Sequence, residues 1–358
     1  MRHRSMSAAA AACVMLTAIF CTPAWAQETD PLILDALNFI SSDVIDADAK
    51  ILTGQAPSFS GTIVSRDVRH PDHQKAEEFL LDRLQESDAD AAAVEFDCGL
   101  DHACANLVAE IPGTVPSDRS WIISAHYDST NGDDPSLPAP GAVDNASGVV
   151  IVLQALSALH RYEFSDTIRF ILFDAEEIGL LGSEAYAAQA SVDGDAIQAV
   201  LNVDVPGWRV QGINLAFASS NGPSWPALQI FDGISRLYPC GTQVLGVPAA
   251  IIDTADMASF WPYGYSAYLV GSLYALTGFM NTGNDTYEKI DIEQCANLSR
   301  VATAYLAQQA GILGTVDDDT SDDVIDDDAQ TDDNSFPDSD MEDTTPSGEN
   351  TGHKGCGC

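Results

Sequence analysis

Basic residues are scarce in this sequence. Its 358 residues include 15 Lys and Arg against 54 Asp and Glu, which gives a formal net charge of −39 at pH 7. Nucleic acids and anionic membrane surfaces carry the same sign of charge and would repel such a chain, so neither is expected as a default partner. The hydrophobic content of 46% nevertheless allows a large buried core.

Motifs of three common enzyme classes are also missing. The chain has no Gly-x-Ser-x-Gly nucleophile elbow, no Gly-x-x-x-x-Gly-Lys-Ser/Thr phosphate loop and no His-Glu-x-x-His helix. A serine hydrolase would therefore need a nucleophile that no motif indicates. A P-loop nucleotide-binding protein and a zinc enzyme built on one His-Glu-x-x-His helix are not indicated either.

No apolar run is long enough to span a membrane. The run Ala8–Phe20 is short, follows Arg2 and Arg4, and precedes the small-x-small cleavage site Ala24-Trp25-Ala26. We therefore predict that residues 1–26 are a signal peptide and that the mature protein has no transmembrane segment. This predicts a secreted, periplasmic or cell-surface protein.

Cysteines are few between the predicted signal and the end of the chain. Export would allow them to form disulfides. Cys98 and Cys104 flank a five-residue segment and are the first pair that we expect. Cys240 with Cys295 is a second candidate, because the sequence does not decide connectivity.

The last part of the chain has few apolar residues. Residues 315–358 carry fifteen acidic residues against Lys354. Such a segment cannot bury enough apolar surface to offset its ordering entropy. We predict a disordered acidic tail, whose terminal Cys356 and Cys358 could attach the protein to a surface.

Residues 27–314 alternate apolar strand patterns with helical patterns, which predicts a single α/β domain. The fold class that we expect is a mixed, mostly parallel twisted sheet sandwiched between helices. The predicted strands are 120–125, 167–173, 199–205, 213–218 and 266–270. The predicted helices are 71–85, 146–159, 180–189, 226–237 and 292–313.

Polar side chains follow these strands where the strands end. In open α/β sheets, ligands bind beyond the carboxyl ends of the strands. One imidazole and several carboxylates are expected at this edge, and so many acids share a cleft only if a cation offsets their repulsion. The sequence therefore predicts a metal site formed from His126, Asp128, Asp144, Glu176, Glu177 and Asp204.

This ordered set resembles the co-catalytic zinc aminopeptidases of the M28 type, over about Ile63–Leu313. The resemblance implies a zinc-peptidase-like fold and an exported metallopeptidase, an aminopeptidase acting on peptide substrates. It implies that His126, Asp144 and Asp204 bind one zinc, and that Asp144 bridges to a second zinc.

The resemblance also implies roles for three further carboxylates. Glu177 would hold the second zinc, and Glu176 would be the general base. Asp128, two residues after the ligand imidazole, would orient the ring of His126.

One position departs from the family pattern. The family closes its second zinc site with a His in a stretch resembling Tyr-His-Thr-Pro-Asn-Asp-Thr, whereas this chain has Asn281 within the run 279–286. An amide oxygen there would leave an all-oxygen second site that suits a harder ion and binds zinc less tightly. The stretch 255–257 also departs, with Ala-Asp-Met where the family has Ser-Asp-His.

Three consequences of this departure are open. The first is a working enzyme with one tight zinc and a weakened or exchanged second metal, since three protein ligands and a water already form a catalytic zinc site. The second is an impaired relative that binds peptides or sugars. The third is a change of reaction, such as a glutaminyl-cyclase-like acyl transfer.

The other histidines and a few apolar residues are expected to have ordinary structural roles. His70 and His73 lie near a predicted helix start and are expected to be exposed. No ligand role is expected for His102, His160 and His353 either, although His353 could in principle supply the missing ligand. The apolar residues Val205, Phe260 and Tyr263 could line a pocket for the first side chain of the substrate. Packing in the core would explain them equally well.

Overall fold

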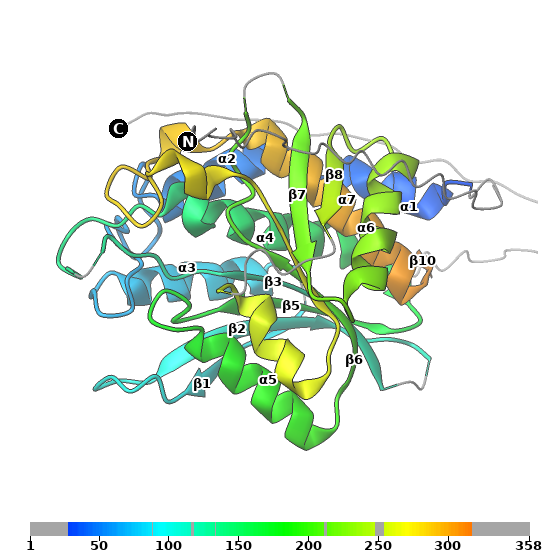
Figure 1. Ribbon diagram of the computed structural model, residues 1–358, viewed down its shortest axis with the longest axis horizontal. Helices are drawn as coiled ribbons and strands as arrows, with labels where there is room; N and C mark the ends of the chain where they lie inside the picture. Colours follow the sequence, from blue (N-terminus) through cyan, green and yellow to red (C-terminus); the bar gives the residue numbers. More distant parts are fainter. Residues whose placement is uncertain are drawn as a thin grey trace, which may run out of the picture. The chain divides into compact units, whose positions relative to one another are not determined.

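The computed structural model describes residues 28–87, 89–115, 118–132, 134–210, 213–247 and 254–316 (Figure 1). The predicted signal peptide lies outside the described residues. So does the predicted tail, apart from Thr315 and Val316.

The core of the fold is an eight-stranded mixed sheet with the order β1-β2-β5-β3-β6-β9-β7-β8. Strands β3, β5, β6 and β9 are mutually parallel, whereas β1, β2 and β7 pair antiparallel to their neighbours toward the centre. The strands are β1 (Asp90–Phe96), β2 (Cys104–Ile111), β3 (Arg119–His126), β5 (Thr167–Phe173), β6 (Ala196–Val203), β7 (Leu215–Ser220), β8 (Gln243–Val247) and β9 (Ala267–Gly271). A separate antiparallel pair joins β4 (Tyr162–Phe164) to β10 (Ile312–Thr315).

Helices cover both faces of the sheet (Figure 1). One face packs against α1 (Pro31–Ala36), α2 (Ser42–Leu52), α3 (His73–Gln85), α4 (Ser147–Leu159), α6 (Trp225–Leu237) and α7 (Ile292–Ala310). The other face packs against α5 (Leu181–Asp193) and the 3₁₀ helix Asp256–Tyr263. Side chains of β3 alternate between the two: Trp121 and Ile123 enter the first core, and Ile122 enters the second.

Helix α4 lies in the middle of the larger core. Its sequence is apolar on all sides, and nearly all of its residues are buried, as expected for a helix surrounded by other elements. No apolar run of this length was expected from the sequence, but in the structure the helical stretch Ala142–Leu159 is long and apolar enough to cross a membrane by length and composition alone. It is 94% buried within this fold. Its contacts with β3 and α7 account for that apolar composition.

The five predicted strands correspond to β3, β5, β6, β7 and β9, and the five predicted helices to α3, α4, α5, α6 and α7. The predicted last helix is too long: α7 ends at Ala310, where Gly311 adopts a left-handed φ of 72°. Residues 312–315 then form β10.

The predicted disulfide between Cys98 and Cys104 is confirmed. The second candidate is wrong, because Cys240 and Cys295 are both free thiols buried in the larger core. Both pack there as small apolar side chains, and burial raises the pKa of Cys240 to about 12.

Candidate metal centre

The parallel strands bring one imidazole and two carboxylates together beyond their carboxyl ends. His126 is the last residue of β3, and Asp204 follows β6 directly. His126 Nε2 lies 3.2 Å from Asp144 Oδ1 and 3.2 Å from Asp204 Oδ1. One ligand atom of each of the three residues lies within 4.8 Å of the others. This group has the donors that a zinc ion accepts.

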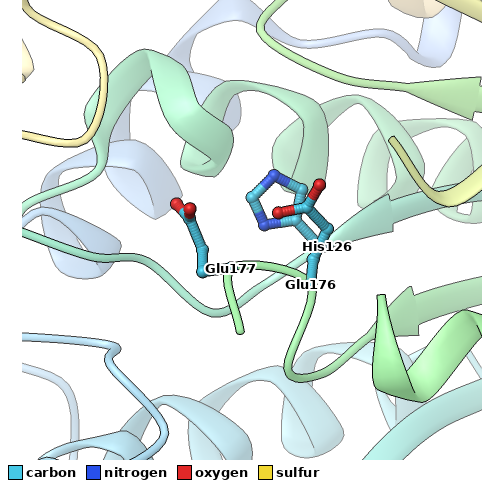
Figure 2. A group of neighbouring side chains, drawn as sticks. All are labelled: His126, Glu176 and Glu177. Carbon is cyan, nitrogen blue, oxygen red and sulfur yellow. The ribbon is translucent and has the colours of Figure 1, made fainter. Parts of the chain in front are cut away.

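A second group shares the same histidine. Glu176 and Glu177 lie in the turn between β5 and α5, and each has a carboxylate oxygen within 4.8 Å of a ring nitrogen of His126. Figure 2 shows the side chains of Glu176 and Glu177 as neighbours of the His126 imidazole. Glu177 Oε1 is buried without a hydrogen-bond partner. A buried carboxylate oxygen of this kind is expected to bind a cation, because it is otherwise costly to desolvate.

Asp128 connects these groups. Its carboxylate accepts hydrogen bonds from the backbone N–H of Glu176 and of Glu177, each at 3.1 Å. Its Oδ1 lies 3.4 Å from His126 Nδ1, and its carbonyl oxygen lies 3.2 Å from the same nitrogen. Since a carbonyl only accepts, Nδ1 carries the hydrogen and the Nε2 lone pair is left for a metal.

Asp144 belongs to the short loop before α4. The peptide bond between Asp144 and Asn145 is cis. The side-chain amide of Asn145 donates to Val203 O at 2.9 Å, and its oxygen accepts from Gly148 N at 3.0 Å. These contacts attach the loop to the end of β6 and to the start of α4.

The site carries more negative charge than its own positive charge balances. Burial raises the pKa of Asp144 to about 6 and raises that of Glu176 and Glu177 well above the usual range. Burial alone would lower the pKa of His126, but Glu176, Asp128 and the other carboxylates raise it well above its usual value. A divalent cation would offset this repulsion, so the described residues fit a metal ion.

A cavity of about 590 Å³ opens over these side chains. One wall carries the carboxylates Asp144, Glu176, Glu177 and Asp204. The rest is lined largely by apolar and small residues, among them Leu180, Val205, Thr254, Leu269, Ser272 and Met280. Such a mixture suits a ligand that has one polar reacting group and an apolar side chain.

Asn281 lines the same cavity. It is exposed, and its φ of 57° lies in the left-handed region, which Asn tolerates better than most residues. Asn281 and the four carboxylates therefore line the same cavity.

The apolar candidates separate into different environments. Val205 lines the cavity, whereas Phe260 is buried in the smaller core and Tyr263 is exposed. His73 was expected to be exposed, and this is wrong: its exposed fraction is 7%. Its partner, Asp174, lies 101 residues away in the sequence, so no local pattern indicated the contact.

Two residues that support the site were not predicted. Asp285 accepts hydrogen bonds from the loop that carries Asp144, and the fully buried Arg66 donates to four backbone carbonyls. Asp285 lies within the run 279–286, so its position beside Asn281 was a usable signal. Arg66 had none, because its partners are backbone atoms.

Comparison with known proteins identifies the family. The model of peptidase family M28 matches residues 106–306, more than half of the chain. This chain belongs to peptidase family M28. The resemblance inferred from the sequence is thereby confirmed.

Curated relatives are similar over part of their length. A probable leucine aminopeptidase of Trichophyton verrucosum is 31% identical over 222 residues, which cover 57% of this chain and 56% of the relative. Leucine aminopeptidase 1 of Coccidioides posadasii is 38% identical over 223 residues, which cover 57% of this chain and 55% of the relative. The chain thus spans just over half the length of these curated relatives.

Solved structures confirm the expected fold class. The LapA aminopeptidase of Legionella pneumophila matches with a TM-score of 0.67 at 20% identity, covering 78% of this chain and 74% of that one. An aminopeptidase from Aneurinibacillus sp. strain AM-1 matches with a TM-score of 0.61 at 15% identity, covering 79% and 97%. At these identities the likeness shows the M28 fold alone.

Proposed function

We propose that this M28 protein is a metal-dependent aminopeptidase that hydrolyses the N-terminal peptide bond of peptides. The observation that carries the proposal is the position of His126 Nε2, 3.2 Å from an oxygen of both Asp144 and Asp204. The relatives named leucine aminopeptidases support the choice of an aminopeptidase.

The two metal positions have different donors. His126, Asp144 and Asp204 would hold a zinc ion tightly, since one imidazole and two carboxylates are typical zinc ligands. Glu177, with Asp144 as the bridge and the amide oxygen of Asn281, would form the second position. This all-oxygen set favours a harder ion and weaker zinc binding. The bound metal supplies a polarised scissile carbonyl and a water of lowered pKa.

Glu176 is the proposed general base. Its backbone is held by Asp128, and its carboxylate lines the cavity beside the ligand group. Burial raises its pKa well above the usual range in the metal-free site, and a bound cation would lower it again. Glu176 can then accept a proton from water and deliver it to the leaving amine.

The substrate fits the cavity by its chemistry. A peptide with an apolar first residue would place its scissile carbonyl at the carboxylate wall. Its side chain would lie against Val205, Leu269 and Met280. Burying such a side chain favours binding by about 1.5 to 3 kcal/mol.

We also propose that the protein is exported. The support for export is the signal-like sequence of residues 1–26. The support for surface attachment is the acidic tail, residues 315–358, which carries Cys356 and Cys358. Surface attachment through the tail predicts that the tail-deleted protein appears in the medium. Equal localisation of both forms would contradict that attachment.

Anilide hydrolysis tests the enzymatic proposal. Wild-type protein loaded with zinc, manganese or cobalt should cleave amino-acid anilides, and Glu176→Gln should lower kcat by about 10² to 10⁴ without changing the metal content. Glu184→Gln, an exposed change on the neighbouring helix α5, is the matched control and should keep full activity.

A wild type that binds metal and peptide but cleaves nothing with any of these metals would contradict the enzyme. It would favour a binding protein instead, the candidate that Asn281 supports. The metal content of Glu176→Gln shows whether Glu176 is a general base or a metal ligand. Loss of metal from this variant would show that Glu176 is a ligand.

A further inference from the structure

A buried carboxylate outside the ligand set contacts the loop that carries Asp144. Asp285 has an exposed fraction of 1%. Its carboxylate accepts hydrogen bonds from Val143 N at 3.0 Å and from Asp144 N at 2.9 Å. The hydroxyl of Tyr274 donates to Asp285 Oδ1 at 2.5 Å. The backbone carbonyl of Asp285 also accepts from Ala142 N at 3.0 Å. Three successive amides of the loop therefore bind one residue.

The buried guanidinium of Arg66 binds the two residues that come just before these three amides. Arg66 is fully buried and donates to Pro140 O at 2.7 Å and to Gly141 O at 2.9 Å. Its Nε donates to Tyr127 O at 2.7 Å, beside Asp128. Gly141 has a left-handed φ of 50°, and a Cβ there would lie 2.9 Å from Arg66 Nη2 and 2.5 Å from Asp144 O. The loop is thus closely enclosed at this point.

The two charged groups bind complementary parts of one loop. The guanidinium of Arg66 binds its carbonyls, and the carboxylate of Asp285 binds its amides. Between these contacts, the side chain of Asp144 points to His126 Nε2 at 3.2 Å. Hydrogen bonds to charged groups are stronger than neutral ones, so this arrangement restricts the direction in which the ligand carboxylate can point.

We propose that Asp285 is a positioning residue for the bridging ligand Asp144, with Arg66 as its counterpart on the other part of the loop. The inference rests on the proposed metal centre. Asp285 acts through the Asp144 backbone and touches neither metal nor substrate. Because Asp285 lies in the same segment as Asn281, it also attaches the cavity wall to the ligand loop.

The chemistry explains why an acid is needed here. A carboxylate accepts all three donors, from Val143, Asp144 and Tyr274, and offers none of its own. An amide at position 285 would turn an N–H group toward a backbone N–H or toward the tyrosine hydroxyl. The tyrosine hydroxyl can accept from that N–H, and Val143 N also lies 3.1 Å from Asp285 Oδ2, but a neutral amide oxygen accepts more weakly than a carboxylate. Asp285→Asn therefore conserves shape but weakens the hydrogen bonds at the loop.

Metal affinity tests the role. Zinc competition with a chelator should show that Asp285→Asn lowers zinc affinity by about tenfold to a hundredfold, the range found when residues behind metal ligands are changed. The visible spectrum of the cobalt-loaded variant should differ from that of the wild type, because the ligand geometry changes. Tyr274→Phe, which removes one hydrogen bond, should lower zinc affinity by about threefold to tenfold.

A matched control lies at the other end of the parallel strands, where Asp166 directly precedes β5. Asp166 is a buried carboxylate that accepts from Trp121 Nε1 at 3.1 Å and pairs with Arg119 at 3.4 Å. Asp166→Asn should keep the zinc affinity and the cobalt spectrum of the wild type even if it lowers the melting temperature. A shift of the same size in Asp166→Asn would overturn the proposal, because it would reveal a general loss of stability.

Amide hydrogen exchange separates this inference from the proposed function. In metal-free protein, Asp285→Asn should speed exchange at Val143 and Asp144, whereas Asp166→Asn should not. A wild type without metal affinity would overturn the metal centre and the positioning role together. Unchanged zinc affinity, cobalt spectrum and exchange in both Asp285→Asn and Tyr274→Phe would overturn the positioning role alone.

Discussion

Two buried imidazoles lie in different electrostatic surroundings. His73, at the start of α3, has an exposed fraction of 7%, and His126 has 1%. The ring of His73 donates from Nδ1 to Arg66 O at 2.8 Å and bonds Asp174 Oδ2 through Nε2 at 3.1 Å. It stacks on Tyr127 with 5.1 Å between ring centroids. Both ring nitrogens thus have a partner, and one carboxylate balances one imidazolium.

His126 is outnumbered by its carboxylates. Asp128, Asp144 and Asp204 lie within 3.4 Å of its nitrogens, and Glu176 and Glu177 complete the group. One imidazolium cannot balance so many acids. A buried histidine with one carboxylate is therefore a complete structural pair, whereas this cluster is balanced only when a cation from solution binds.

The largest effect is expected from removing the imidazole of His126. His126→Ala should abolish tight zinc binding and lower kcat/KM by about 10³ or more, since a lost metal removes several kcal/mol of transition-state stabilisation. Metal content after dialysis and anilide hydrolysis measure both effects. Retention of a full zinc equivalent by His126→Ala would contradict the assignment of this ligand.

Removing the other imidazole should affect stability and leave metal content unchanged. His73→Gln leaves the buried Asp174 without a cationic partner, which should lower the free energy of unfolding by about 3 kcal/mol. Chemical denaturation measures this change. His70→Gln is the control, because that ring is only half-buried; loss of zinc in His73→Gln would refute a purely structural role.

The stabilisation by His73 should depend on pH. Burial alone lowers the pKa of this imidazole, but the charge of Asp174 raises it from 6.5 to about 9. Because the folded pKa lies above the unfolded value, the stabilisation is fully present below about pH 6.5 and is lost as pH rises through 9. The difference in unfolding free energy between wild type and His73→Gln should narrow across this window. A constant difference would argue against a charged pair.

The smallest expected effect concerns the second metal position. Asn281→His would return an imidazole to the cavity wall and should raise zinc affinity at this position by about tenfold. Isothermal titration of protein that already holds one zinc measures it. Asn284→His places the same ring at a nearby exposed position and should change nothing. Equal affinities in wild type and Asn281→His would refute the placement of Asn281 at this site.

The sequence predicted most of the central strands and several helices, but it missed some elements whose residues are exposed or mixed. Strand β5 was predicted with its observed bounds, because its residues are mostly apolar and buried, with only Thr167 and Arg169 interrupting the pattern. Strand β1 was missed, since most of its residues are exposed and it is rich in alanine. Helix α2 was missed because polar residues interrupt its apolar face, although Ser41 caps it by accepting from Val44 N.

The candidate site was predictable to a similar extent. His126 and Asp204 stand at or just after the carboxyl ends of β3 and β6, and Glu176 and Glu177 follow β5 within four residues. Strand order alone brings such residues to one edge. The supporting residues were not predicted. Asp285 lies in the run 279–286 beside Asn281, which was a usable signal, but its partners are backbone amides that no side-chain pattern indicates. Arg66 donates to backbone carbonyls, which are present at every position and leave no trace in the sequence.

The sequence alone indicated which imidazole and carboxylate groups lie at the carboxyl ends of the parallel strands. Strand patterns and the direction of the chain are enough to determine that edge of the sheet. Only the folded chain showed that His73 has a single carboxylate partner while His126 has several, and that Asp285 holds the loop of Asp144. These arrangements depend on groups far apart in the sequence that meet within hydrogen-bond distance once the helices pack on the sheet.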